Sequence, residues 1–247
     1  MADTLMQQSV RYGTEEITYQ VRFLASKSGK VAIHIHPNGS VQVDAPAGSE
    51  LRDVKQAVQK RARWLIQHLT RIREQQSEVL TRRYISGESH FYLGRRYSLK
   101  VLDSDGGKPT VKMLRGQLQI DTLDRSAETL KRLLWNWYLS HAREVFQRRA
   151  AALVPKIIWL KGQIPPIKLL TMKKQWGSCS PKGNILLNPH LVKAPRECVD
   201  YVIVHELCHL RVHNHSPEFY RLLSQVMPEW KTFKAKLDGM AEVLLNS

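Results

Sequence analysis

The sequence is poor in cysteine and in acidic residues, and it has no long hydrophobic run. Its three cysteines are Cys179, Cys198 and Cys208, a sparse and odd set that argues against a disulfide framework and favours reduced thiols. No apolar run approaches the roughly 18 residues of a membrane-spanning helix. Residues 1–20 lack the basic stretch followed by an apolar segment that marks a secretory signal. We therefore expect a cytoplasmic protein that does not cross a membrane.

The shortage of acidic residues leaves a strongly basic chain. Its 247 residues include 38 Lys or Arg and 22 Asp or Glu, which gives a formal net charge of +16. Such a charge attracts polyanions over long distances. Residues 52–83 contain nine basic and three acidic residues, a pattern that is also typical of a solvated helix face. The charge is thus compatible with a nucleic-acid or nucleotide partner without identifying one.

Hydrophobic patterning predicts the α+β class. Residues 1–50 alternate as strands do, with a tight turn at residues 37–39, and residues 51–80 and 126–152 have helical periodicity. Residues 91–121 between them predict a small antiparallel sheet, and no internal repeat is evident. We expect an N-terminal β-rich portion over 1–50, a helix, small sheet and long helix over 51–154, and a C-terminal α+β unit over 155–247.

His205, Glu206 and His209 form the motif H-E-x-x-H. With 10 His and 13 Glu in the chain, random placement gives about 0.02 such matches, so the motif is a specific signal. The surrounding CVDYVIVHELCHL is apolar and predicts a buried helix. Residues four apart share a helix face, so both imidazoles can bind one ion. Glu206 is rotated by about 100° and is placed to reach a water on that ion.

A zinc site needs a third protein ligand, and His213, His215 and Glu218 compete for the role. On a continuous helix His213 lies about 12 Å from His205, too far for two zinc–nitrogen bonds of about 2.0–2.1 Å. Residues 214–218, NHSPE, contain the signals of a helix end followed by a new helix start. A turn there brings His215 back over the first two histidines. We predict His215 as the third ligand, with His213 and Glu218 as alternatives; the structural alternative is a trio of hydrogen-bonded core histidines.

Three protein ligands leave the fourth zinc position open, which distinguishes catalytic from structural sites. Zinc lowers the pKa of bound water to about 7, and Glu206 would accept its proton as the water attacks a carbonyl. Cys179 offers two competing interpretations. It would close the site as a fourth ligand, or it would act as a nucleophile, which an enzyme that activates water does not need.

Three segments, QWGSCSPKGNILLN, PRECVDYVIVHELCHLRVHNHSPEFY and MPEWK, resemble the YgjP-like family of predicted metal-dependent hydrolases. This family is also called the domain-of-unknown-function 45 family and is related to SprT-like and other zincin metallopeptidases. The resemblance is strongest over residues 171–230 and extends more weakly over IHIHPNGSVQVDAP and FYLGRRYSL. It implies His205, His209 and His215 as ligands and Glu206 as general base. Val212 stands where metzincins have glycine, so the metzincin turn is not implied.

The resemblance also implies how the cleft is built. In zincins a strand before the active-site helix lines the cleft and pairs with an extended substrate; here that strand would be residues 184–188, NILLN. The segment WGSCS would lie beside the metal, with substrate-binding roles for Trp176, Gly177, Ser178 and Cys179. The alternative for this segment is a tight structural turn around Gly177.

We therefore expect a zincin-like metallopeptidase C-terminal unit with an N-terminal β-rich portion and connecting helices, acting with one zinc ion on peptides or proteins. One alternative is a metal-dependent hydrolase of nucleotide phosphoanhydride bonds, which the basic charge and an open zinc site permit. The other is a nucleic-acid-binding module with a structural zinc. SprT-like relatives include proteases acting on DNA-bound proteins, an analogy that agrees with the charge of +16.

Overall fold

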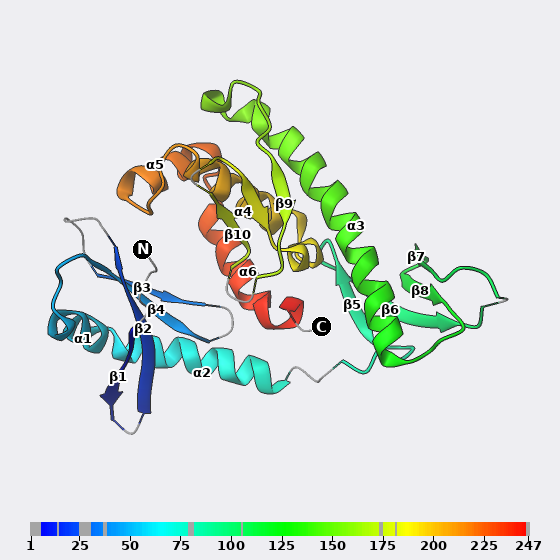
Figure 1. Cartoon of the computed structure of the whole chain (residues 1–247), viewed down its shortest axis with the longest axis horizontal. Helices are drawn as coiled ribbons and strands as arrows, with labels where there is room; N and C mark the ends of the chain where they lie inside the picture. Colours follow the sequence, from blue (N-terminus) through cyan, green and yellow to red (C-terminus); the bar gives the residue numbers. More distant parts are fainter. Residues whose placement is uncertain are drawn as a thin grey trace. The chain divides into compact units, whose positions relative to one another are not determined.

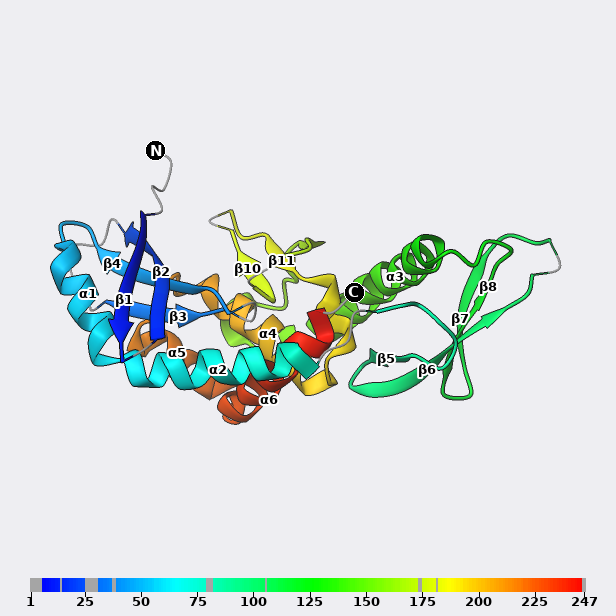
Figure 2. The ribbon, with the colours of Figure 1, turned by 90° about the horizontal axis from the view of Figure 1, so that it is seen from below.

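The chain divides into two compact units, residues 1–80 and 81–247, shown in Figures 1 and 2. The computed structural model describes residues 6–13, 15–24, 31–36, 39–78, 82–104, 106–172, 175–180 and 182–245. Each unit contains helices and a sheet, so the predicted α+β class is confirmed. The division differs from the segment limits expected at residues 50 and 154. Residues 51–69 share a core with the N-terminal sheet, whereas the long helix over 127–153 shares one with the C-terminal residues.

The first unit is a four-stranded sheet covered by two helices. Its strands are β1 (Met6–Tyr12), β2 (Glu15–Leu24), β3 (Ala32–Ile35) and β4 (Val41–Pro46), in the order β1-β2-β4-β3. Alternate residues of β4 are buried because side chains alternate between the two faces of a strand. β3 and β4 form the predicted hairpin, although residues 37 and 38 of its turn lie outside the described residues.

Two helices, α1 (Leu51–Lys60) and α2 (Ala62–Glu78), replace the single helix predicted over residues 51–80. The interruption is at Arg61, which has non-helical dihedral angles of φ −108° and ψ 7°. Val54 and Val58 of α1 and Leu65 of α2 are fully buried in the same core. The break therefore allows both helices to direct apolar residues to one sheet.

The second unit begins with another four-stranded sheet. Its strands are β5 (Ser89–Tyr92), β6 (Arg95–Leu102), β7 (Thr110–Leu114) and β8 (Gln117–Asp121), in the order β5-β6-β8-β7. β5 and β6 form one antiparallel hairpin and β7 and β8 form another, but β6 pairs with β8 in parallel. The sheet is thus mixed, and the prediction of a purely antiparallel sheet was wrong on this point, because hydrophobic alternation does not indicate the direction in which two hairpins pair.

The two four-stranded sheets have the same topology, an internal repeat that was not evident from the sequence. In each sheet the second strands of two hairpins pair in parallel. Residues 39–46, GSVQVDAP, correspond to residues 116–123, GQLQIDTL. Val41 and Val43 occupy the same buried places as Leu118 and Ile120. Only this short alternating pattern is shared, which is too little to stand out in the sequence.

The helix α3 (Ala127–Leu153) connects this sheet to the remainder of the second unit. The hydroxyl of Ser126 accepts a hydrogen bond from the backbone N–H of Thr129 and caps its first turn. α3 contacts β7 and β8 near its start and β9 (Ile167–Leu169) farther along, as Figure 1 shows. None of the described helices combines the length and the apolarity needed to cross a bilayer.

The C-terminal part contains a small sheet and three helices. β10 (Gly177–Cys179), β11 (Ile185–Leu187) and β9 lie in the order β10-β11-β9. The three helices are α4 (Arg196–His209), α5 (Pro217–Val226) and α6 (Trp230–Leu245). They are preceded by the short 3₁₀ helices η1 (Val154–Lys156), η2 (Ile158–Leu160) and η3 (Pro189–Lys193). α4 contacts α3, α5, α6 and β10. Contacts on several sides explain why its sequence is apolar almost all round.

An ion pair joins α3 to α4, and the turn between β5 and β6 packs closely against the start of α4. Arg149 of α3 donates two hydrogen bonds of 2.7 Å to the carboxylate of Asp200 in α4, the bidentate geometry that strengthens such pairs. The β5–β6 turn lies against the start of α4. Gly94 in this turn has φ +77°, and a Cβ atom there would lie 2.9 Å from the Cα of Pro195.

We predict that Gly94→Ala destabilises the protein by about 2–3 kcal/mol, because a left-handed backbone conformation and a backbone clash combine at this position. Gly116→Ala is the matched control: its φ is +76°, but a Cβ atom there meets nothing within 4 Å. Gly116→Ala should lower the free energy of unfolding by only about 1 kcal/mol. Urea denaturation of both variants measures the difference; equal losses would show that the contact with Pro195 does not constrain the turn.

Candidate active site

The end of α4 brings three histidines together. His205 and His209 lie one turn apart on α4, which ends at His209. This end is five residues earlier than the turn predicted at Asn214. The N–H of Val212 donates to the carbonyl of Cys208 at 3.0 Å, and the chain then returns toward α4. A helix start follows at residues 216–218 as predicted, with the Ser216 hydroxyl accepting from the N–H of Phe219.

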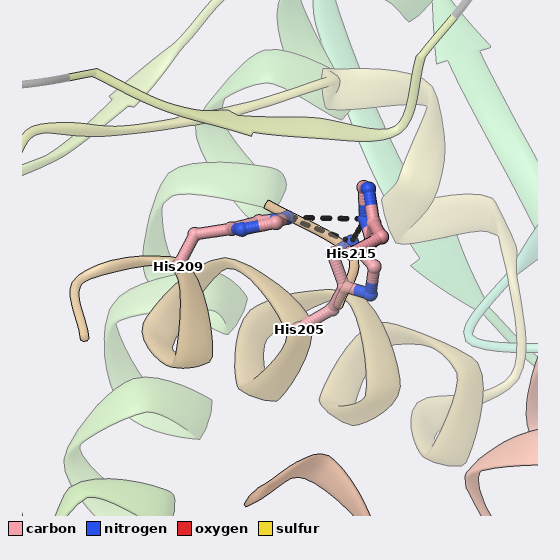
Figure 3. Close-up of side chains that lie close together, drawn as sticks. All are labelled: His205, His209 and His215. Atoms are coloured by element: carbon pink, nitrogen blue, oxygen red, sulfur yellow. Dashed lines mark hydrogen bonds between the residues drawn. The ribbon is translucent and has the colours of Figure 1, made fainter. Parts of the chain in front are cut away.

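The three imidazoles point toward one another, as Figure 3 shows. The Nε2 atom of His209 lies 3.2 Å from that of His205 and 3.2 Å from that of His215, and the Nε2 atoms of His205 and His215 are 3.0 Å apart. Zinc–nitrogen bonds of about 2.0–2.1 Å in tetrahedral geometry place two ligand nitrogens about 3.3 Å apart. The observed separations therefore fit a single zinc ion.

Three side chains form a cluster of potential metal ligands. Among the described residues, these are His205, His209 and His215, whose potential ligand atoms lie within 4.8 Å of one another. The residues that competed for the third or fourth position do not belong to it: His213, Glu218 and Cys179. A cluster of three imidazoles without a cysteine has the composition of sites that keep one position for water or substrate.

The protonation states of His205 and His209 are also those that binding of a metal cation requires. His209 Nδ1 lies 3.0 Å from the carbonyl oxygen of Val212. Because a carbonyl only accepts, Nδ1 carries the proton and Nε2 of the neutral ring presents its lone pair. Burial lowers the pKa of His209 and holds the pKa of His205 well below its usual 6.5. Both rings are thus neutral at pH 7, as metal ligation requires.

Phe219 completes the histidine cluster, and the sequence alone did not single it out. Its ring centroid lies 4.9, 4.4 and 4.9 Å from those of His205, His209 and His215. The side chain is fully buried, so it restricts the orientations of all three imidazoles. The available signal was its place in the first turn of α5, where an apolar residue follows the exposed residues Pro217 and Glu218.

Glu206 is buried on α4 and packs against β10. Its exposed fraction is 4%, and burial raises its pKa to about 8. A Cβ atom on Gly177 would lie 2.7 Å from Oε1 of Glu206, so only glycine leaves room for this carboxyl group. Such a pKa leaves the carboxyl group mostly protonated at pH 7, and a cation held by the neighbouring histidines would lower it toward the carboxylate form that accepts a proton.

The WGSC segment lies beside this carboxyl group. Trp176 is buried, whereas Gly177, Ser178 and Cys179 form β10 and are partly exposed. Burial and the nearby Glu206 carboxyl raise the pKa of the Cys179 thiol. The thiol is therefore protonated at pH 7, which does not favour a nucleophilic role.

The strand NILLN does not have the position expected of a substrate-binding strand. β11 lies between β10 and β9 and pairs with both, so its backbone already bonds on either side. The expectation that it pairs with substrate is therefore wrong. β10 lies at the edge of this sheet, and a free edge is what strand addition requires. Alternation of apolar residues identified the strand but not its place in the sheet order.

A groove of about 710 Å³ lies next to the histidines along α5 and the start of α6. Tyr220 and Trp230 line it, and the centroids of their stacked rings are 5.3 Å apart. The ring centroids of Tyr220 and His215 are 6.2 Å apart. The rest of its lining is polar or basic: Arg221, Ser224, Gln225 and Lys231, with Pro217. An open groove of this composition can hold an extended polar chain.

Comparison with known proteins gives a match to a protein family and matches among solved structures. Residues 29–240 match the family described as YgjP-like, metallopeptidase domain. The crystal structure of the metallopeptidase zymogen abylysin from Pyrococcus abyssi is 24% identical and covers 45% of this chain and 96% of that chain, with a TM-score of 0.30. No curated protein matches the chain.

We predict that His215→Ala weakens zinc binding by on the order of 100-fold or more, because one of three converging nitrogens is lost. His213→Ala is the matched control, since His213 is exposed and outside the cluster. Competition with a chromogenic chelator measures both affinities. Full zinc affinity in His215→Ala together with a loss in His213→Ala would assign the third ligand to His213.

Proposed function

The chain belongs to the YgjP-like metallopeptidase family, and on this premise we propose that it hydrolyses peptide bonds with one zinc ion bound by His205, His209 and His215. Glu206 is the general base. The convergence of the three Nε2 atoms to within 3.0–3.2 Å is the observation that carries this proposal. When bound, zinc supplies Lewis-acid chemistry, because it polarises a carbonyl and lowers the pKa of water.

Glu206 handles the protons in this mechanism. Its carboxylate takes a proton from the attacking water at one carboxyl oxygen and later gives it to the leaving amine. The low exposure of the side chain, 4%, limits access of bulk water to that proton. The close contact with Gly177 restricts where the carboxyl group can lie, and positioning of this kind contributes to the rate.

β10 aligns the substrate. A peptide that adds to the edge of the sheet at residues 177–179 would run past both Glu206 and the histidines, since β10 packs directly on α4. Backbone hydrogen bonds of this type accept many sequences, and side-chain pockets then provide selectivity. The groove along α5, lined by Tyr220 and Trp230, is available for those side chains.

We predict that Glu206→Gln lowers the rate of casein hydrolysis by on the order of 10²–10⁴-fold, because the amide cannot accept the proton. Zinc content should stay at one equivalent, since Glu206 is not a ligand. Zinc-loaded wild type and variant are compared on casein and on nucleoside triphosphates in parallel. Phosphate release that is lost in the variant, without peptide cleavage in the wild type, would favour the phosphoanhydride hydrolase instead.

Gly177→Ala should lower peptidase activity on the order of 10²-fold, because the added methyl group displaces the Glu206 carboxyl. Zinc affinity should change little. Gly239→Ala, where a Cβ atom meets nothing within 4 Å, is the control for a Gly-to-Ala change. Full activity of Gly177→Ala would mean that the position of Glu206 is not constrained by β10.

A further inference from the structure

The groove along α5 and the start of α6 has a lining that carries charge of one sign. Its charged side chains at pH 7 are Arg221 and Lys231, and among the described residues no carboxylate belongs to the lining. Glu218 and Glu229, the acidic residues nearest to these cations in the sequence, lie outside it. The groove therefore presents two cations to a ligand, beside the histidines of the candidate active site.

Neither cation is neutralised by an ion pair within the part of the chain that the structure describes. Arg221 and Lys231 are both exposed, and neither has a carboxylate partner there. Lys231 contacts a ring instead, with its Nζ atom 5.8 Å from the ring centroid of Trp230. Lys234 and Lys236, farther along α6, are by contrast paired with carboxylates. The charge of the two groove residues is thus available to a bound molecule.

The aromatic part of the groove is held in a fixed position. Trp230 has an exposed fraction of only 9%, and its Nε1 donates a hydrogen bond of 2.9 Å to Oγ of Ser224. Its ring is stacked with those of Tyr220 and Tyr201, at interplanar angles of 19° and 13°. Tyr220 is 40% exposed and provides the accessible part of this stack. A surface that is already ordered can pack against the carbon atoms of a bound chain at little entropic cost.

The same stack connects the groove to the three histidines. The ring centroid of Tyr220 lies 6.2 Å from that of His215, and the ring centroid of Tyr201 lies 5.8 Å from that of His205. An extended peptide advances about 3.3–3.6 Å per residue, so about two residues cover such a distance. A substrate side chain in the groove would therefore belong to a residue within a few positions of the bond that is cleaved.

We propose that this groove makes the protein selective for acidic peptide segments, whose Asp and Glu carboxylates contact Arg221 and Lys231. The inference rests on the proposed peptidase function and names the class of its substrate. The guanidinium group of arginine can bind a carboxylate through two parallel hydrogen bonds, and lysine adds a point charge. The carbon atoms of the segment lie against Tyr220 and Trp230.

Two cations at a fixed place discriminate more sharply than a diffuse net charge. An acidic segment is attracted by both groove residues, whereas a basic segment is repelled by both. Each exposed ion pair changes an affinity by a factor of a few, so replacing Glu by Lys in the segment should change the rate by roughly 10-fold. A neutral segment should lie between these two.

Three quenched fluorescent peptides test the selectivity. They have the same length and differ only in the residues on either side of the cleaved bond, which are Glu, Gln or Lys. With the full-length, zinc-loaded protein at low ionic strength, kcat/KM should be roughly 10-fold higher for the Glu peptide than for the Lys peptide, with the Gln peptide between them. At an ionic strength of about 1 M, where the Debye length is about 3 Å, this ratio should fall.

Two charge-reversal variants locate the effect. Arg221→Glu should lower the Glu-to-Lys ratio of kcat/KM to about 1 or below, because it replaces an attraction by a repulsion at the groove. Lys100→Glu is the matched control, since it makes the same change of charge at an exposed residue of β6 outside the groove. The control should keep the wild-type ratio.

Peptide affinity gives a second readout that does not require cleavage. It is measured by fluorescence anisotropy with zinc-loaded Glu206→Gln, and the Glu peptide should bind most tightly. Equal kcat/KM values and equal affinities for the three peptides would overturn the selectivity and leave the peptidase proposal intact. An equal fall of the ratio in Arg221→Glu and Lys100→Glu would also overturn it, because the preference would then come from the net charge of +16. If no peptide is cleaved, the peptidase proposal fails, and the affinities still decide whether the groove prefers acidic chains.

Discussion

The structure of the site depends on one short reversal of the chain after α4. Two interactions of Val212 define it: its N–H bonds to the carbonyl of Cys208, and its carbonyl accepts from Nδ1 of His209. The first has the i→i−4 spacing of a helical bond and satisfies the Cys208 carbonyl at the end of α4, and the second selects the tautomer of a histidine whose Nε2 faces the cluster. Because the chain then returns, His215 reaches the same point as His205 and His209. On an unbroken helix, residues 205 and 215 would be about 15 Å apart along the axis.

The remainder of the second unit holds the helix that carries this reversal. α4 contacts α3, α5, α6 and β10, and Arg149 binds Asp200 in its middle. A helix fixed on several sides keeps its side chains in one position, as the proposed catalysis by a carboxyl group and a metal would require. The contact between Glu206 and Gly177 adds an internal constraint between that helix and the edge strand.

The positive charge of the chain has at least one specific location. The average composition, +16 over 247 residues, suggested a polyanionic partner without a place for it. Arg82, Lys131 and Lys193 are far apart in the sequence, yet they line one cavity. Burial lowers the pKa of Lys193 to about 7, so this amine can lose its charge near neutrality instead of being balanced by a carboxylate.

The sequence by itself determined the α+β class, the helix with H-E-x-x-H and the new helix start at Ser216, because these depend on local periodicity and capping. It also led to the YgjP-like metallopeptidase family, which the match over residues 29–240 confirms. It did not reveal the repeated sheet topology, the parallel pairing of β6 with β8 or the central position of β11, since strand order and direction depend on contacts between distant segments. Only the tertiary structure placed Phe219 against the three imidazoles and gathered Arg82, Lys131 and Lys193 around one cavity. Both arrangements result from packing between elements that no local pattern encodes.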